Sequence, residues 1–142
     1  MQNVQLLIHG QSVNSSSAQT FERISPIDGT VASVASAATL EDVDQAIESA
    51  HRAFDIWSKL SPTERRLRLL KAADLMDQKT EQFIQIGMRE TGSTATWYGF
   101  NVHLAANMLR EAAAMTTQID GSIIPSDVPG NLAMGIRVPC GV

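Results

Sequence analysis

The stretch TLEDVDQAIESAHRAFDIW, residues 39–57, decides the fold class. Its apolar side chains recur every three or four positions, so that in a helix they fall on one face. Thr39 stands just before this pattern and Asp42 follows three residues later. That spacing is close to a capping box, in which side chains satisfy the first backbone N–H groups of a helix. The stretch therefore predicts an amphipathic helix.

More helices are expected up to residue 119. Ser61, Pro62 and Glu64 predict the start of a second helix, because serine suits the N-cap, proline suits the first helical position and glutamate closes the box. Asp77 or Thr80 is expected to cap a third helix, and glycine at position 92 is a natural helix end. An alanine-rich stretch from 95 to about 118 predicts a fourth helix.

The flanking segments have β character. Residues 1–38 combine short apolar runs with turn formers, and His9-Gly10 and Asp28-Gly29 are expected hairpin turns. In residues 120–142, the stretch 132–138 alternates weakly between apolar and polar and a new extended run begins at Pro139. The expected fold class is α/β, with a β-rich N-terminal arm (1–38), a helical segment (39–119) and a β segment (120–142). Because the chain stops on an apolar residue within an extended run, we expect a piece of a longer protein and an incomplete domain.

Composition narrows the function classes. The 142 residues carry a net charge of −4, which argues against a nucleic-acid-binding surface. No apolar run is long enough to cross a bilayer, and the first residues lack the basic region of a signal peptide. Cys140 is the only cysteine, so no internal disulfide is possible, and a lone thiol fits a reducing compartment. A cytoplasmic protein without membrane or nucleic-acid partners is expected.

Few residues are candidates for chemistry. A catalytic cysteine needs a base or a helix N-terminus to lower its pKa, whereas Cys140 lies between Pro139 and Gly141 with no histidine nearby in sequence. A structural role for Cys140 is the better interpretation. The three histidines, at positions 9, 51 and 103, match no metal-ligand spacing. No glycine-rich phosphate-binding motif occurs.

The aromatic pair Trp97-Tyr98 begins the fourth predicted helix. Trp97, Asn101, Leu104 and Met108 fall on one face of that helix. An apolar face with one polar group is compatible with a packing seam and with the wall of a pocket for a ring-bearing ligand. Periodicity alone favours packing.

Several ordered motifs resemble the aldehyde dehydrogenase superfamily. They cover nearly the whole chain and read FERISPIDGTV (21–31), ATLEDVD (38–44), AHRAF (50–54), SPTER (61–65), ETG (90–92) and RVPCGV (137–142). Residues 97–125, which begin WYGFNVH, look most like the branch of salicylaldehyde and vanillin dehydrogenases. Ser93 departs from the family pattern, which commonly has lysine after ETG. Cys140 occupies a position where the family has various side chains, which supports its incidental role.

The resemblance implies an enzyme that oxidises an aromatic aldehyde to its carboxylic acid with NAD or NADP. In that family a cysteine thiolate attacks the aldehyde, donors hold the oxyanion and a glutamate activates water. The family pattern places these residues and the nucleotide-binding turn after residue 142, so neither catalytic nor cofactor-binding residues are expected here. It implies a homo-oligomer, a dimer or tetramer, with the β segments in the subunit-association arm. It also implies helices that pack on a nucleotide-binding domain.

For the fourth helix, the resemblance implies a position beside the substrate tunnel. Trp97, Asn101 and Leu104 are therefore the predicted substrate-binding residues. A catalytically inactive fragment or a helical interaction module of the same fold is the alternative.

Overall fold

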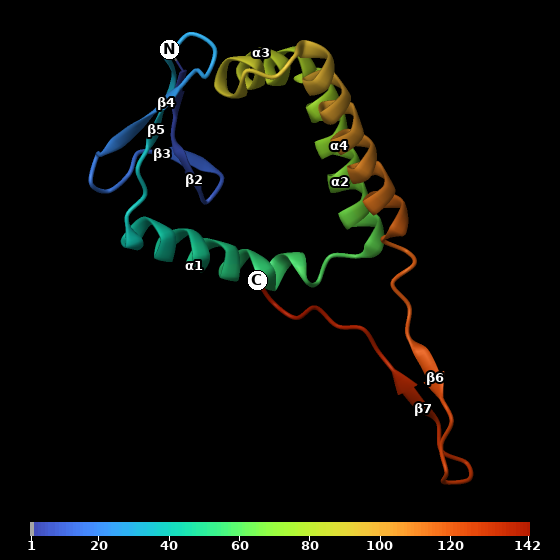
Figure 1. Ribbon diagram of the computed structural model, residues 1–142. Helices are drawn as coiled ribbons and strands as arrows, with labels where there is room; N and C mark the ends of the chain where they lie inside the picture. The colour runs from blue at the N-terminus through green and yellow to red at the C-terminus, as the bar shows by residue number, and fades with distance from the viewer. Residues whose placement is uncertain (1) are drawn as a thin grey trace.

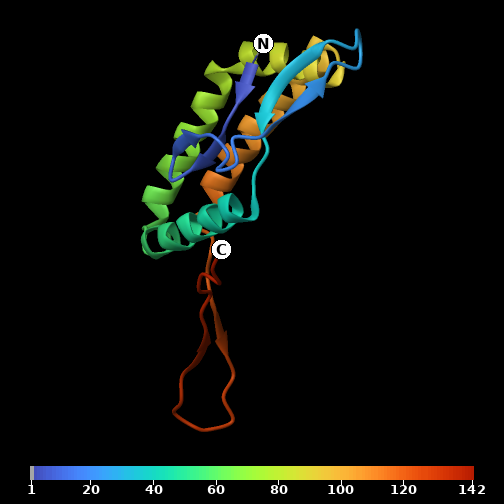
Figure 2. The same cartoon turned by 90° about the vertical axis from the view of Figure 1, so that its left-hand side faces the viewer.

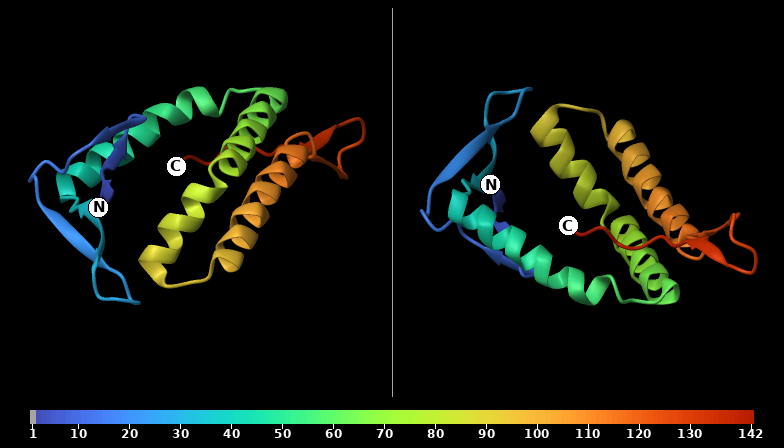
Figure 3. Two further views of the ribbon diagram at one scale, coloured as in Figure 1. Left: turned by 90° about the horizontal axis from the view of Figure 1, so that it is seen from above. Right: turned by 90° about the horizontal axis from the view of Figure 1, so that it is seen from below.

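The computed structural model describes residues 2–142, so Met1 of the predicted arm lies outside the described residues. Figure 1 shows small β elements and one helix on one side, a helix pair on the other, and a β-ribbon that projects away from both. Seen from above and below, the helices form the sides of an open frame (Figure 3). The accessible surface is 10436 Å². A compact protein of 15.4 kDa would expose about 7,200 Å², so the described chain is far from spherical.

The N-terminal strands form two small sheets. β5 (Val31–Ser36) is the central strand of the first sheet, with β1 (Gln2–Val4) parallel on one side and β4 (Thr20–Ile24) antiparallel on the other. β5 carries the buried side chains of this sheet, among them Ala32 and Ser33 at 2% and 1% exposure. β2 (Leu6–Ile8) and β3 (Gln11–Val13) form a separate hairpin.

Both predicted hairpin turns are present. His9 and Gly10 have φ values of 56° and 71°, so the two central residues of the β2–β3 turn both adopt the left-handed conformation that such tight turns require. In the β4–β5 connection, Gly29 has a φ of 71°. Asp28 accepts hydrogen bonds from the backbone N–H and the hydroxyl of Thr30, at 3.1 and 2.9 Å. These local bonds stabilise the β4–β5 turn.

α1 (Leu40–Trp57) begins with the predicted capping box. Asp42 N–H donates to the Thr39 hydroxyl at 3.2 Å, and Thr39 N–H donates to the Asp42 carboxylate at 2.9 Å. The same carboxylate accepts from the Ser15 hydroxyl at 2.9 Å and from Ser16 N–H at 3.1 Å. The cap therefore also ties the loop after β3 to the start of the helix.

α2 (Pro62–Gln78) and α4 (Ala95–Met115) pack side by side along their length (Figures 1 and 2). Ala73 of α2 and Ala106 of α4 have no exposed surface. Small side chains at such positions let two helices approach closely. Arg110 of α4 adds a polar clamp, because its guanidinium donates to Asp74 at 2.9 Å and to Asp77 at 2.7 Å.

α3 (Thr80–Thr91) joins the helix pair at one end. Gly92 ends it as predicted, with a φ of 74° and an N–H that donates to the Met88 carbonyl at 2.9 Å. The predicted start of α3 is wrong in one respect. Lys79 is the N-cap and no side chain caps the helix, while the Thr80 hydroxyl donates backwards to the Asp77 carbonyl at 2.8 Å.

The last segment forms a two-stranded ribbon of β6 (Ser122–Ile124) and β7 (Ala133–Gly135). Figure 2 shows it extending well beyond the helices. α4 ends at Met115, three residues before the predicted end at about 118. Thr116 accounts for the difference, since its hydroxyl donates to the Ala113 carbonyl at 2.9 Å and replaces the next helical hydrogen bond. Within residues 2–142, no helix is long and apolar enough to cross a membrane.

Candidate functional site

The predicted substrate-binding residues all lie on α4, which starts immediately after the left-handed turn at Gly92. Thr94 is the N-cap of α4, and its hydroxyl accepts the N–H of Trp97 at 3.3 Å. The turn and the cap therefore fix where the first turn of α4 begins. Trp97 belongs to this fixed turn, so its backbone position follows directly from local sequence.

One face of α4 is buried and the opposite face is open. Val102, Ala106 and Ala113 are at most 5% exposed. By contrast, Trp97 is 58% exposed, Leu104 44% and Met108 65%. The helix thus uses its small side chains for packing and presents its large apolar side chains outward. Residues 2–142 therefore do not bury Trp97, and its exposure is compatible both with packing against another part of the protein and with the wall of a pocket.

Asn101 lies between these apolar side chains, one turn after Trp97. Its side-chain amide donates a hydrogen bond of 2.7 Å to the backbone carbonyl of Trp97. This short bond holds the side chain along the helix surface. The structure therefore brings Trp97, Asn101 and Leu104 together on one face, as the spacing predicted, and forms a wall rather than an enclosed cavity.

Phe100 belongs to the same wall but was not among the predicted site residues. Its ring lies next to that of Trp97, with centroids 5.9 Å apart and planes inclined by 31°. Phe100 is also 56% exposed. The signal that points to it is its position three residues after Trp97, because side chains at that separation are neighbours on a helix.

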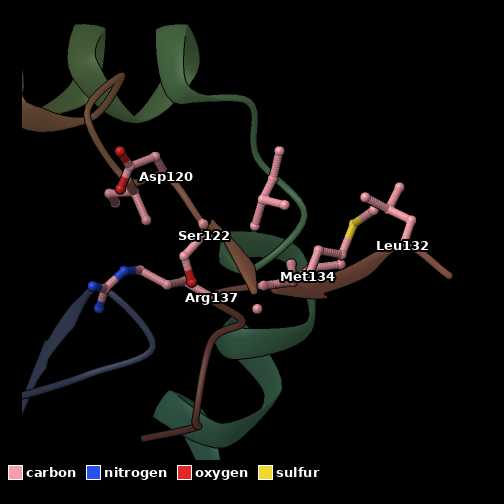
Figure 4. Close-up of a pocket in the computed structure, with 10 residues that line it drawn as sticks. Asp120, Ser122, Leu132, Met134 and Arg137 are labelled. Atoms are coloured by element: carbon pink, nitrogen blue, oxygen red, sulfur yellow. The ribbon is translucent and has the colours of Figure 1, made fainter. Parts of the chain in front are cut away.

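A separate hollow lies at the base of the β6–β7 ribbon (Figure 4). Its lining is mostly apolar, with Asp120 and Arg137 as the charged side chains. Leu132 and Met134 lie at one end and Asp120, Ser122 and Arg137 toward the other. None of the predicted substrate-binding residues contributes to it. The Ser122 hydroxyl makes no hydrogen bond to Asp120, and the Arg137 guanidinium stays protonated, so the lining shows no nucleophile paired with a base.

The cysteine and the histidine at position 9 show no arrangement typical of catalysis or metal binding. Cys140 is exposed, and its thiol lies 3.9 Å from the Val138 carbonyl. His9 is hydrogen-bonded to Ser49 at 3.0 Å and to Arg52 at 2.8 Å. No group of three or more metal-ligating side chains occurs in residues 2–142.

The N-termini of α1 and α2 do not fit a dinucleotide phosphate. Hydrogen bonds, first from the backbone of Thr39, lower the pKa of Asp42 to about 2, so the first turn of α1 already holds a carboxylate. The backbone N–H of Ser61 lowers the pKa of Glu64 in the same way at the start of α2. A negative charge at these positions repels a phosphate. The connection from β5 to α1 contains no glycine that would let a phosphate approach the backbone.

Known proteins match this chain along its length. The model of the aldehyde dehydrogenase family matches residues 13–142. A vanillin dehydrogenase from Pseudomonas fluorescens is 56% identical over all 142 residues. The crystal structure of a salicylaldehyde dehydrogenase from Pseudomonas putida G7, complexed with salicylaldehyde, matches 98% of the chain with a TM-score of 0.95 and 42% identity.

A third protein, the NAD-dependent benzaldehyde dehydrogenase from Corynebacterium glutamicum, matches 91% of the chain with a TM-score of 0.84 and 31% identity. In each case the chain spans less than a third of the other protein. It covers 29% of the vanillin dehydrogenase, 29% of the salicylaldehyde dehydrogenase and 28% of the benzaldehyde dehydrogenase. The matched part is the N-terminal one.

Proposed function

The chain belongs to the aldehyde dehydrogenase family, and we propose that the full-length protein oxidises an aromatic aldehyde of the vanillin or salicylaldehyde type to its carboxylic acid. The observation that carries this proposal is the 56% identity to a vanillin dehydrogenase along the entire chain. The benzaldehyde dehydrogenase that shares the fold uses NAD. NAD or NADP is therefore the proposed hydride acceptor.

The exposed wall of α4 supports the choice of substrate class. Trp97 and Leu104 offer apolar surface suited to an aromatic ring, and Asn101 places one polar group within that surface. In chemical terms, vanillin and salicylaldehyde are both phenols that carry an aldehyde. We propose that Trp97, Asn101 and Leu104 form one side of the substrate tunnel.

In this proposal the chemical step belongs to residues after position 142. Two features of residues 2–142 support this. The thiol of the exposed Cys140 contacts a backbone carbonyl rather than a basic side chain, and the N-termini of α1 and α2 are occupied by Asp42 and Glu64. The role of this part of the protein is to shape the tunnel and to support the domain that binds the nucleotide. The alternative, an inactive fragment or helical interaction module, keeps the same fold without turnover.

The three predicted segments take separate roles in the proposal. Residues 39–119 pack against the nucleotide-binding domain, and the β segments 1–38 and 120–142 contribute to the arm that joins subunits in a homo-oligomer, a dimer or tetramer. The large accessible surface supports contacts of this kind. The proposed location is the cytoplasm, which a chain with a single thiol fits.

Replacing Trp97 with alanine in the full-length enzyme tests the tunnel. We expect KM for vanillin or salicylaldehyde to rise about tenfold, which corresponds to ~1.4 kcal/mol of lost binding, while KM for a short aliphatic aldehyde changes little. Trp57→Ala is the matched control, because Trp57 is the other tryptophan and lies on α1. Equal changes in KM for both kinds of aldehyde in Trp97→Ala would assign Trp97 to packing instead.

The placement of the chemistry is tested with two proteins. The full-length enzyme should reduce NAD or NADP in the presence of an aromatic aldehyde, and residues 1–142 alone should not. Absorbance of the reduced nicotinamide measures both. Turnover by residues 1–142 would refute the placement of the catalytic residues. If the full-length protein shows no turnover, the alternative of a protein without activity is favoured.

A further inference from the structure

The orientation of the Asn101 side chain carries information about the substrate. We propose that the Asn101 side-chain oxygen, Oδ1, accepts a hydrogen bond from a ring hydroxyl of the aldehyde, and so selects hydroxylated benzaldehydes over benzaldehyde. This inference rests on the proposed function and specifies its substrate subclass. In this proposal, one oxygen atom distinguishes aldehydes that differ only by a ring hydroxyl.

The hydrogen bond to Trp97 decides which end of the amide faces outward. Only the NH₂ group of asparagine can donate to a carbonyl, and Asn101 lies 2.7 Å from the Trp97 carbonyl oxygen. In many exposed asparagines the oxygen and nitrogen exchange places without steric consequence. Here that exchange would set two acceptors against each other, so Oδ1 is the atom that is left for other partners.

No donor within residues 2–142 uses Oδ1. The hydrogen bond to Trp97 is the one in which the Asn101 side chain takes part. Trp97 and Leu104, which share this face of α4 with Asn101, supply exposed apolar surface. When a ligand displaces water from such a surface, an acceptor without a donor is strongly unfavourable. A ligand that suits the wall therefore needs an apolar body and one donor.

The electrostatics of α4 favour a neutral donor over a cation. The first turn of this helix contains no acidic residue, and Asn101 and its neighbours Trp97 and Leu104 are uncharged. An amine or guanidinium would find no opposite charge there. A phenolic hydroxyl is neutral, is attached to a ring that stacks on Trp97, and donates one hydrogen bond.

The experiment compares four aldehydes in the full-length enzyme. They are benzaldehyde and its 2-, 3- and 4-hydroxy derivatives, assayed at a pH at which the phenols keep their proton. Asn101→Leu removes the acceptor and keeps a side chain of similar size. We expect kcat/KM for at least one hydroxybenzaldehyde to fall about tenfold relative to benzaldehyde. The isomer with the largest fall identifies the ring position that Asn101 contacts.

Asn107→Leu is the matched control, since Asn107 lies on the same helix and its amide contacts His103 at 3.0 Å. This variant should leave the ratios of kcat/KM unchanged. Asn101→Ala repeats the test if the leucine variant folds poorly. Equal effects of Asn101→Leu on all four aldehydes, or no effect, would overturn the inference. If the wild-type enzyme oxidises none of the four, the proposed function fails instead.

Discussion

Asp42 joins two parts of the chain that are far apart in sequence. Its carboxylate accepts hydrogen bonds from Thr39, Ser15 and Ser16. The residue is 5% exposed. The bonds to the ionised carboxylate lower its pKa to about 2, against an ordinary value of 3.8. They do so because hydrogen bonds to the charged form favour that form.

The first prediction concerns acid stability. A carboxyl whose pKa is lower in the folded state stabilises the fold above the unfolded pKa, and that stability is lost as the pH falls. For Asp42 the loss should occur between about pH 4 and pH 2. We expect thermal unfolding to show that Asp42→Asn lowers the midpoint at pH 6 and flattens its fall in this range. Asp55→Asn, an exposed change on the same helix, should do neither.

Of these contacts, the sequence predicts those between residues that are close together in the chain. Thr39 and Asp42 stand three residues apart, so their capping box follows from spacing. The bond from Ser15 to Asp42 spans 27 residues, and no local pattern encodes it. The same division holds on α4. Trp97, Asn101 and Leu104 share a face by periodicity, whereas the direction of the Asn101 amide depends on a hydrogen bond to the Trp97 carbonyl that helical spacing does not predict.

At the scale of elements, α3 and α4 meet at a glycine. A Cβ atom added at Gly87 would lie 2.1 Å from the ring of Tyr98. The Tyr98 ring is held in turn by a hydrogen bond of 3.1 Å between its hydroxyl and that of Thr91. The close approach of the two helices therefore requires the absence of a side chain at position 87.

Gly87→Ala tests this contact. We expect it to reduce the free energy of unfolding by about 1–3 kcal/mol, because the added methyl group forces the ring and the helices apart. Gly99→Ala is the matched control on the neighbouring helix, since its Cβ would lie 3.5 Å from Ile84, an ordinary contact. That change should stabilise the protein by about 0.5–1 kcal/mol through the helix preference of alanine. Chemical denaturation measures both, and equal effects would contradict the argument.

Helix starts were easier to predict than other boundaries. Ser61 and Glu64 form the predicted box, with the Ser61 N–H donating to the carboxylate at 2.9 Å. The cap of α3 was predicted wrongly, because Thr80 uses its hydroxyl within the preceding turn. The strands are three to six residues long, too short for periodicity to define their partners. The parallel pairing of β1 with β5 had no sequence signal.

The whole molecule exposes more apolar surface than its size requires. Large side chains are exposed on every helix, among them Leu40 at 85%, Leu67 at 60% and Trp97 at 58%. Many exposed large apolar side chains are typical of surfaces that contact other protein. The sequence predicted the apolar stripes, but only the structure shows that residues 2–142 leave them largely uncovered.

Purified residues 1–142 should therefore self-associate. We expect sedimentation or light scattering to detect dimers or larger species whose fraction rises with protein concentration, because each apolar contact removes exposed surface from water. Asp or Lys in place of Ile47 and Leu67, which are 58% and 60% exposed, should shift the distribution toward monomer. If the chain stays monomeric at high concentration, the exposed apolar helix faces do not drive association, and the argument is wrong.

The projecting β6–β7 ribbon has a consequence for the protein while it is still being made. Two isolated strands with unpaired outer edges are templates for aggregation. Prolines at 125, 129 and 139 and charges at 120, 127 and 137 lie in the loop between the two strands and on either side of them, and such residues act as gatekeepers against that outcome. These six residues should therefore slow edge-to-edge association of newly made chains, before the ribbon meets any other surface.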